Sequence, residues 1–352
     1  MTALSRFRIA ALLGSTLAAA FVALPAQAAE IVLATWGGSW GKAIAEQAVA
    51  PFEKATGVKV RVISGVSLAN MQMVAAQRAA PKIDLIMSTV TDAVVAYNDG
   101  LLAPLSAKEV PNLASLPDSG IRRDASGAPM FAGMWMYPYG IAYRTDKVKG
   151  EIKCWKDLWQ PALKNKVGVS SPKYMNGYFL LMTNKMAGGT EADVAPGLAM
   201  VKTLGQNLVA VADDSATQQR LLAEGEVWAV PMISTPAFKL VDDGVPAKFV
   251  VPCEGAPAGL DVLSLVKNGP NPADAKKFID FYISPTTIGA LAAELKITPV
   301  NRNAKLTPEQ AKYTISESDF GKLTTFSDKA IADNRAKWQD SWDREIAPMT
   351  KR

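Results

Sequence analysis

The pattern that decides the fold lies in the stretch IVLATWGGSWGKAIAEQAVAPFEKATGVKVRVI, residues 31–63. The apolar run at 31–35 ends in glycines and predicts a buried strand, while apolar residues recur at helical spacing over 41–55. This helix is expected to bend at its internal proline and to end at Gly57, because glycine readily adopts the left-handed conformation that follows a helix. The alternating VKVRVI at 58–63 then predicts a second strand.

The segments that follow repeat this order of strand and helix. Helical spacing returns over 68–80, and the apolar run IDLIM at 83–87 predicts a third strand. A βαβαβ order implies a parallel sheet covered by helices. The alternation recurs downstream, with predicted strands at 167–169, 209–211 and 227–230. Helices are predicted at 175–186, 215–223 and 326–346. Another helix is predicted to start at Pro272, with Asn271 as its cap. Two such units without a low-complexity linker predict two lobes joined by crossing strands, with a cleft between them.

The composition is that of a folded protein without a histidine-based active site. The chain has 352 residues, of which 49% are hydrophobic and 20% charged, and it contains no histidine. Serine–histidine catalysis, cysteine–histidine catalysis and HExxH zinc sites are therefore excluded. Two cysteines are too few for a cysteine-rich zinc site. The net charge of +5 is small and the basic residues are scattered along the chain, so no nucleic-acid partner is expected.

A signal peptide is predicted over residues 1–28. Two arginines precede an uncharged stretch at 9–24, and AQA at 26–28 is typical of a cleavage site. The uncharged stretch is shorter than the roughly 20 residues of a membrane span, which favours a signal over an anchor. In an oxidising compartment Cys154 and Cys253 would either form a disulfide or remain separate as two small core residues. The sequence does not decide between these alternatives.

A glycine-rich loop with two tryptophans follows the first predicted strand. Trp36, Gly37 and Gly38 lie where backbone N–H groups can approach a ligand at the start of a helix. The alternative is a plain turn between strand and helix. The spacing around Lys42 does not match a phosphate-binding P-loop.

Two further segments contain candidate binding groups. WMYPYG at 135–140, which includes Tyr139, predicts either a crossing strand that lines the cleft or core packing. Asp261 lies beside an apolar run, where an unpaired carboxylate is costly, and is interpreted either as a cap or as the partner of a ligand ammonium group. Asp84, inside the third predicted strand, is interpreted as a structural residue that is hydrogen-bonded to backbone.

Five stretches carry a resemblance to a known family. In chain order they are IVLATWGGSW, PKIDLIMST, YGIAYRTDKV with CWKDLWQPALKNKVGVSSP, DDGVPAKFVVPCEGAPAGLDVLSLVKN, and NPADAKKFIDFYISPTTIGALAAELKITPVN. Together they resemble the secreted solute-binding proteins of ABC importers, in the branch that includes spermidine/putrescine-binding proteins. The resemblance implies a two-lobed α/β periplasmic-binding-protein fold of type II, in which each lobe is a mostly parallel sheet flanked by helices and two strands cross between the lobes. Lobe one would comprise 30–138 plus 262–308, and lobe two 139–261 plus 309–352.

The expected ligand-binding residues lie on both lobes. They are Trp36, Gly37, Gly38, Ser88, Thr89, Tyr139, Tyr174 and Asp261. Of these, Asp261 matches the carboxylate that pairs with a ligand amine in polyamine binders. The chain departs from those binders at 170–176, which lacks an acid and adds Lys173, and at Gly259, where they have a tryptophan.

These departures bear on the solute. Without the missing acids, the distant ammonium of a long polyamine would be buried unpaired. We therefore expect a small, polyamine-like amine-containing solute that is either shorter than those polyamines or carries a single cationic group. The alternative is a zwitterionic or anionic solute with Lys173 or Arg144 as its partner.

The resemblance also implies the partners. We expect a monomer in the periplasm that binds a small-molecule solute and docks on an ABC permease and ATPase complex in the inner membrane. No catalysis, cofactor or metal is expected. The competing hypotheses are an exported enzyme on a similar two-lobed fold, which would need paired carboxylates or a lysine, and a binding protein that delivers its solute to a receptor.

Overall fold

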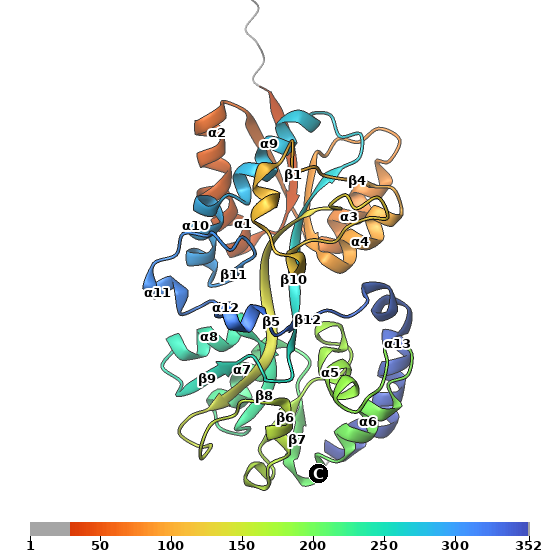
Figure 1. The fold of residues 1–352 in the computed structure, drawn as a ribbon, viewed down its shortest axis with the longest axis vertical. Coiled ribbons are helices and arrows are strands. Elements are labelled where there is room, and N and C mark those ends of the chain that lie inside the picture. The colour runs from red at the N-terminus through yellow and green to blue at the C-terminus, as the bar shows by residue number, and fades with distance from the viewer. Residues whose placement is uncertain (1–28, 351–352) are drawn as a thin grey trace, which may run out of the picture.

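Two strands run through both lobes of the molecule. The computed structural model describes residues 29–350, so the predicted signal peptide at 1–28 lies outside the described residues. Figure 1 shows β5 (Ala132–Arg144) and β10 (Ala256–Val266) along the centre of the long axis, with one lobe at each end. They are neighbours in the strand order β2-β1-β3-β10-β5-β8-β6-β7.

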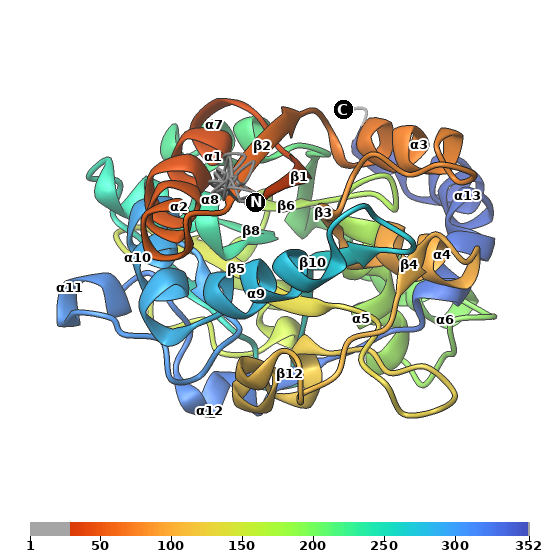
Figure 2. The ribbon, with the colours of Figure 1, turned by 90° about the horizontal axis from the view of Figure 1, so that it is seen from above.

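Lobe one is built on the sequence that opens the fold. β1 (Glu30–Thr35) pairs in parallel with β2 (Lys59–Ser64) and β3 (Leu85–Thr89), and β10 runs antiparallel to β3. Figure 2 shows α1, α2 and α10 to one side of these strands and α3 and α4 to the other. The remaining elements of this lobe are α1 (Gly38–Ile44), α2 (Ala50–Thr56), α3 (Ser67–Ala76), α4 (Val90–Asn98), β4 (Leu102–Ala103), α9 (Pro272–Tyr282), α10 (Pro285–Leu295) and β11 (Thr298–Pro299).

Lobe two repeats the layered arrangement. β6 (Val167–Val169) pairs in parallel with β7 (Leu208–Val211) and β8 (Ala229–Ile233), and β8 runs antiparallel to β5. The other elements are α5 (Tyr178–Met186), α6 (Ala195–Lys202), α7 (Ser215–Ala223), α8 (Ser234–Asp242) and β9 (Ala247–Val250). The C-terminal segment then passes from lobe one to lobe two through α11 (Pro308–Ala311), α12 (Glu317–Phe320), β12 (Leu323–Thr324) and α13 (Asp328–Glu345). None of the helices within residues 29–350 is both long and apolar enough to cross a membrane.

Two local predictions are refined by the structure. The helix expected over 41–55 is present, but a π-helical turn at Ala45–Val49 joins α1 to α2. This turn precedes Pro51, which has no N–H to donate to an α-helical hydrogen bond. Asn271 does stand before α9, yet its side chain does not cap the helix and instead donates to the Glu30 carbonyl. That part of the prediction is wrong.

The interpretation of Asp84 is confirmed. Its carboxylate accepts from the backbone N–H of Val32 at 2.9 Å and from that of Asn271 at 2.6 Å. The side chain therefore ties the start of β3 to β1 and to the loop before α9. Since Asp84 is fully buried, these hydrogen bonds compensate for its desolvation.

The two cysteines form a disulfide. The Cα atoms of Cys154 and Cys253 are 4.8 Å apart, and 99 residues separate them along the chain. The bond ties the loop after β5 to the segment that leads into β10, so both lie in lobe two beside the crossing strands.

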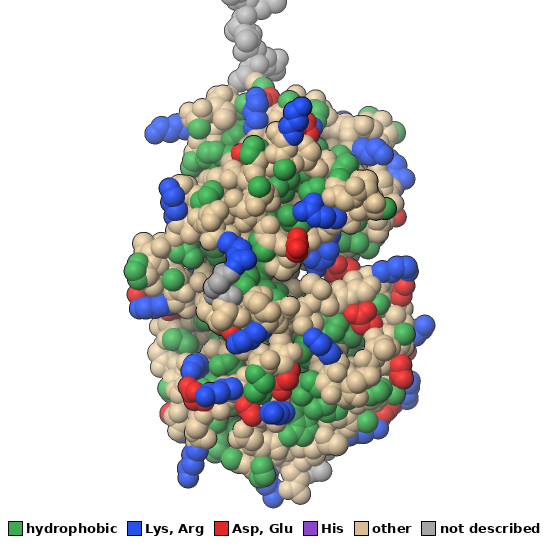
Figure 3. Space-filling model, viewed as in Figure 1, with side chains coloured by type: hydrophobic (Ala, Val, Ile, Leu, Met, Phe, Trp, Pro, Cys, Tyr) green, Lys and Arg blue, Asp and Glu red, His purple; other side chains and the backbone are tan. Residues whose placement is uncertain are grey.

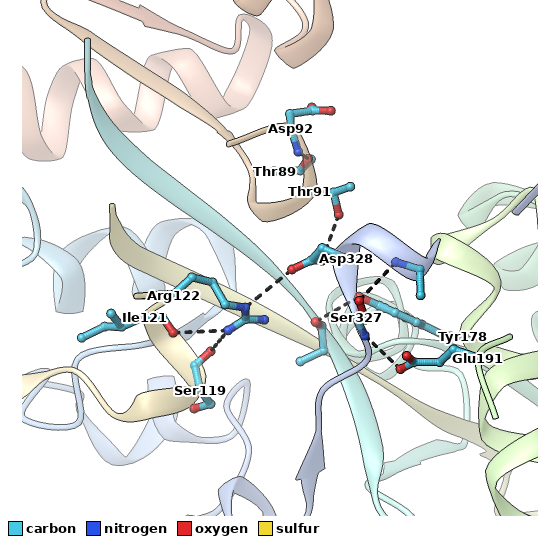
Figure 4. Close-up of polar contacts among 12 residues, drawn as sticks. Thr89, Thr91, Asp92, Ser119, Ile121, Arg122, Tyr178, Glu191, Ser327 and Asp328 are labelled. Carbon is cyan, nitrogen blue, oxygen red and sulfur yellow. Dashed lines mark hydrogen bonds and ion pairs between the residues drawn. The ribbon is translucent and has the colours of Figure 1, made fainter. Parts of the chain in front are cut away.

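Polar contacts also bridge the lobes outside the crossing strands. Nε of Arg122, from lobe one, lies 3.6 Å from Oδ2 of Asp328, and Thr91 of α4 donates to Oδ1 at 3.4 Å (Figure 4). Asp328 begins α13, whose Trp338 and Trp342 pack in the core of lobe two. Burial raises the pKa of Asp328, because desolvation outweighs the attraction of Arg122.

A second contact lies across the molecule. Lys296, at the end of α10, pairs with Asp242 of α8. Figure 1 places α8 and α10 on the side opposite α13. The lobes are therefore held together by an ion pair on each side of the crossing strands.

The disulfide should contribute measurably to stability. The double variant C154S/C253S should lose about 2–4 kcal/mol of unfolding free energy, because the bond closes a long loop in the unfolded chain. Chemical denaturation followed by circular dichroism measures this loss. Reductant should lower the stability of the wild type and leave the double variant unchanged. Equal stability of oxidised and reduced wild type would contradict the prediction.

Loss of the Arg122–Asp328 contact should favour an open arrangement of the lobes. A partly buried ion pair contributes about 1 kcal/mol, so R122Q should shift the ligand-free equilibrium between closed and open forms about fivefold toward the open form. Small-angle X-ray scattering would show this as a larger radius of gyration. The control is K329Q, since Lys329 neighbours Asp328 but pairs with the exposed Asp333. Identical scattering of R122Q and wild type would disprove a role in closure.

Candidate ligand-binding cleft

The cavity that Asp261 lines lies between the lobes and has a volume of about 480 Å³; we call it the main cavity because of this position and not because of its size. This size falls within the range of small-molecule sites. Figure 3 shows a hollow between the lobes on one face, with acidic and basic side chains mixed over the surface around it. Lobe one and the crossing strands contribute Trp40, Tyr137 and Asp261 to the cavity lining, and lobe two contributes Tyr174, Met175, Ser215, Gln219, Ile233, Thr235, Pro236 and Lys239.

Asp261 is a buried carboxylate at this cavity. It is 7% exposed and accepts hydrogen bonds from Trp135 Nε1 at 2.8 Å and from the Tyr137 hydroxyl at 3.0 Å. Burial raises its pKa to about 7, although the two hydrogen bonds act in the opposite direction. Near neutral pH the side chain is therefore poised between its protonated and its charged form.

Of the two interpretations of Asp261, the cap is wrong. The residue lies inside β10, opposite Trp135 of β5 and Thr89 of β3. The strand register shifts between Asp261 and Val262, so that a bulge falls at the carboxylate. Bulges re-aim side chains beside functional sites.

Aromatic rings form the wall around Asp261. The ring of Trp40 lies 5.3 Å from that of Trp135, and the ring of Trp36 lies 5.9 Å from Trp135. Trp40 lines the cavity, whereas Trp36 packs beside it. Gly37 precedes the first residue of α1, and Gly38 begins α1 with a φ of +62°, which other residues adopt only at a cost.

Tyr137 takes the space that a side chain at position 259 would need. A Cβ atom built on Gly259 would lie 1.8 Å from Cε2 of the Tyr137 ring. In polyamine binders this position is expected to carry a tryptophan. Here the glycine of one crossing strand lets the tyrosine of the other lie against the cavity.

On the lobe-two side of the main cavity, a hydrogen bond between two hydroxyl groups positions the side chains of the lining. The hydroxyls of Tyr174 and Ser215 are hydrogen-bonded at 2.6 Å, where α7 begins. Met175 and Asn176 both adopt left-handed backbone, with φ of 46° and 55°. Such conformations cost about 1–2 kcal/mol for residues other than glycine, and they concentrate at functional sites.

A second chamber of about 180 Å³ adjoins the main cavity. Tyr137 and Met175 line both spaces, so the two share a wall. The other residues around the second chamber are Thr89, Val90, Thr91, Lys173, Asn176, Tyr178, Gly259, Leu260 and Arg335.

The structure brings together only part of the predicted set. Asp261 and Tyr174 line the main cavity, and Thr89 lines the second chamber while its side chain caps α4. Ser88 is fully buried in β3, and its hydroxyl has no hydrogen-bond partner among the described residues.

Tyr139 lies elsewhere. It is fully buried in lobe two, where its hydroxyl contacts Ser170 and its ring stacks on Trp155 with centroids 6.1 Å apart. The core-packing alternative thus describes Tyr139, while its neighbour Tyr137 faces the cavity. Trp40 and Tyr137 were missed as individual residues, although both stand in aromatic stretches that the sequence marks as unusual.

Comparison with known proteins identifies the family. The model of the family described as "Bacterial extracellular solute-binding protein" matches residues 47–317. The putrescine-binding periplasmic protein PotF of Escherichia coli is 26% identical over 293 residues, which cover 76% of this chain and 77% of PotF. An uncharacterized protein of Haemophilus influenzae is 26% identical over 237 residues, which cover 64% of this chain and 66% of that protein.

Solved structures confirm the fold that the sequence predicts. A putative extracellular solute-binding protein from Bordetella parapertussis superposes with a TM-score of 0.81 at 23% identity, covering 90% of this chain and 99% of that one. The spermidine/putrescine ABC transporter substrate-binding protein PotD from Streptococcus pneumoniae gives a TM-score of 0.74 at 17% identity, with the same coverage. The chain therefore belongs to the bacterial extracellular solute-binding proteins, a family of non-enzymatic transport components.

Proposed function

We propose that this protein captures a small amine-containing solute in the cleft, in the periplasm, and delivers it to the membrane permease of an ABC importer. The observation that carries the proposal is the buried Asp261 carboxylate, held by Trp135 and Tyr137 at the wall of an aromatic cavity. The predicted signal peptide and the disulfide favour an oxidising compartment outside the cytoplasm.

The chemistry of the site suits a single ammonium group. A charged carboxylate in a buried position is stabilised by an opposite charge, and an ammonium supplies both that charge and hydrogen-bond donors. The faces of Trp40 and Tyr137 would add cation–π attraction of about 0.5–2 kcal/mol each. Among the described residues, Asp261 is the one carboxylate in the lining of the main cavity, which favours one cationic group over several.

The relatives support the same class of solute. PotF is described as putrescine-binding, and two further relatives at 24% and 27% identity are described as spermidine/putrescine-binding periplasmic proteins. These identities are low, and among residues 29–350 the linings of the two spaces contain no acid besides Asp261, whereas a long polyamine would require more than one. The proposal is accordingly for small amines rather than for spermidine.

Asp261 should be required for binding. In D261N the charge is lost while the shape is kept, so the affinity for an amine that stabilises the wild type should fall by about tenfold to a hundredfold, as expected for a charge-assisted hydrogen bond. Thermal unfolding of the protein from Ala29 onward against monoamines, diamines and amino acids identifies the ligand, and calorimetry gives the affinity.

The matched control for this experiment is D340N, which removes one exposed carboxylate from α13, away from the cavity. It should bind as the wild type does. Unchanged binding by D261N, or no stabilisation by any amine, would refute the proposal.

Amine affinity should depend on pH with a defined sign. Because the pKa of Asp261 is raised to about 7, the carboxyl must lose a proton before it can pair with an ammonium below that pH. Affinity should therefore fall about tenfold for each unit below about pH 6.5 and level off above about pH 7.5. Calorimetry between pH 5 and pH 8 tests this, and D261N should remove the dependence. An affinity that increases toward acidic pH would contradict the prediction, because it would mean that the ligand binds the protonated carboxyl of Asp261.

A further inference from the structure

The second chamber of the cleft differs from the main cavity in charge. We propose that the solute is a zwitterion. Its ammonium group would bind at Asp261, and its carboxylate or phosphonate group would bind at Lys173 and Arg335. This inference rests on the proposed amine site and adds a second recognition element to it. The class of ligand becomes small amino acids in the chemical sense, in which an amine and an acid are joined by a short chain.

The lining of the second chamber includes two cations and no acid. Lys173 and Arg335 both contribute to it, and none of its described lining residues is Asp or Glu. Lys173 follows β6 in the loop that leads to α5, and Arg335 is carried by α13. Two elements distant in sequence thus bring positive charge to the same space.

Neither cation is neutralised by a carboxylate within residues 29–350. No ion pair involves Lys173, and the side-chain contact of Arg335 is a 3.4 Å hydrogen bond to the amide oxygen of Asn176, which also lines the chamber. Lys239, the cation in the lining of the main cavity, differs because it pairs with Asp243, and Arg122, which bridges the lobes nearby, pairs with Asp328.

The adjoining carboxylates are already engaged. Asp328 accepts from Thr91, whose residue lines the chamber, and it is held by Arg122 (Figure 4). Asp92, in the first turn of α4, accepts from Ser67 at 2.6 Å. An anionic ligand group would therefore meet two cations whose charge no acid of the described chain offsets.

One short ligand can contact both chambers. Tyr137 and Met175 line each of them, so the amine site and the cationic site lie on either side of the same two residues. Asp261 lines the main cavity, and Lys173 and Arg335 line the second chamber, so the two adjoining spaces differ in charge. A diamine would place its second ammonium against two like charges, which selects against it.

Ligands of matched length test the proposal. Calorimetry should compare butylamine, putrescine and 4-aminobutyrate, which share an amine and differ in what the far end carries. The wild type should bind 4-aminobutyrate at least tenfold more tightly than butylamine, and putrescine more weakly than 4-aminobutyrate. The comparison is repeated for chains of two to six carbons, and 3-aminopropylphosphonate distinguishes a phosphonate from a carboxylate preference.

The variants K173Q, R335Q and K173Q/R335Q assign the effect. The double variant should lose the tenfold or larger advantage of the ω-amino acid while it binds the simple amine as the wild type does. The matched control is K337Q, because Lys337 is an exposed cation on α13 that lines neither chamber. Full retention of the advantage by the double variant would overturn the proposal.

The two proposals fail in different ways. If simple amines bind with dependence on Asp261 but no carboxylate or phosphonate group adds affinity at any chain length, amine capture stands and the zwitterion inference is overturned. If neither simple amines nor ω-amino acids bind, or if D261N binds them unchanged, the amine site itself is refuted.

Discussion

The pairing of β5 with β10 is the constraint on which the rest of this structure depends. Each strand leaves the core of one lobe and enters the core of the other, and the two remain paired at the crossing, with Pro138 opposite Ala258 and Tyr137 opposite Gly259. At the crossing, Pro138 has no N–H to donate to a hydrogen bond and Gly259 has no side chain to pack. These two residues therefore contribute fewer stabilising contacts than the others in the pair. The ring of Tyr137 occupies the space left by the glycine.

The same two strands also assemble the buried carboxylate. β10 supplies Asp261, and β5 supplies both of its donors, Trp135 and Tyr137. Trp135 and Tyr137 pack against the core of lobe one, whereas the opposite wall, which carries Tyr174, packs against the core of lobe two. In a hinge closure of the two lobes around a ligand, this lobe-two wall would be the part that approaches the buried carboxylate.

The positions of the site residues were harder to predict than the fold. Trp135, Tyr137 and Tyr139 alternate along β5 and so share one side of a regular strand. They nevertheless have three different surroundings, because the strand passes from the core of lobe one to the cleft and then to the core of lobe two. Alternation predicts that the three residues are equivalent, and only the location of the crossing separates them. Likewise, both tryptophans of the WGGSW loop are candidates by sequence, but Trp40 lines the cavity and Trp36 packs beside it.

By itself, the sequence determined the α/β fold and the order of its elements, because strand and helix periodicities, Gly57 and the apolar runs are local properties of the chain. It also singled out Asp261, since a carboxylate beside a buried strand requires a partner. Only the tertiary structure decided that the cysteines pair, that Asp261 lies in the strand with two donors, and that Lys173 and Arg335 share a chamber. Each of these depends on distances between segments far apart in the chain, and such distances follow from how the lobes pack around β5 and β10 rather than from local patterns.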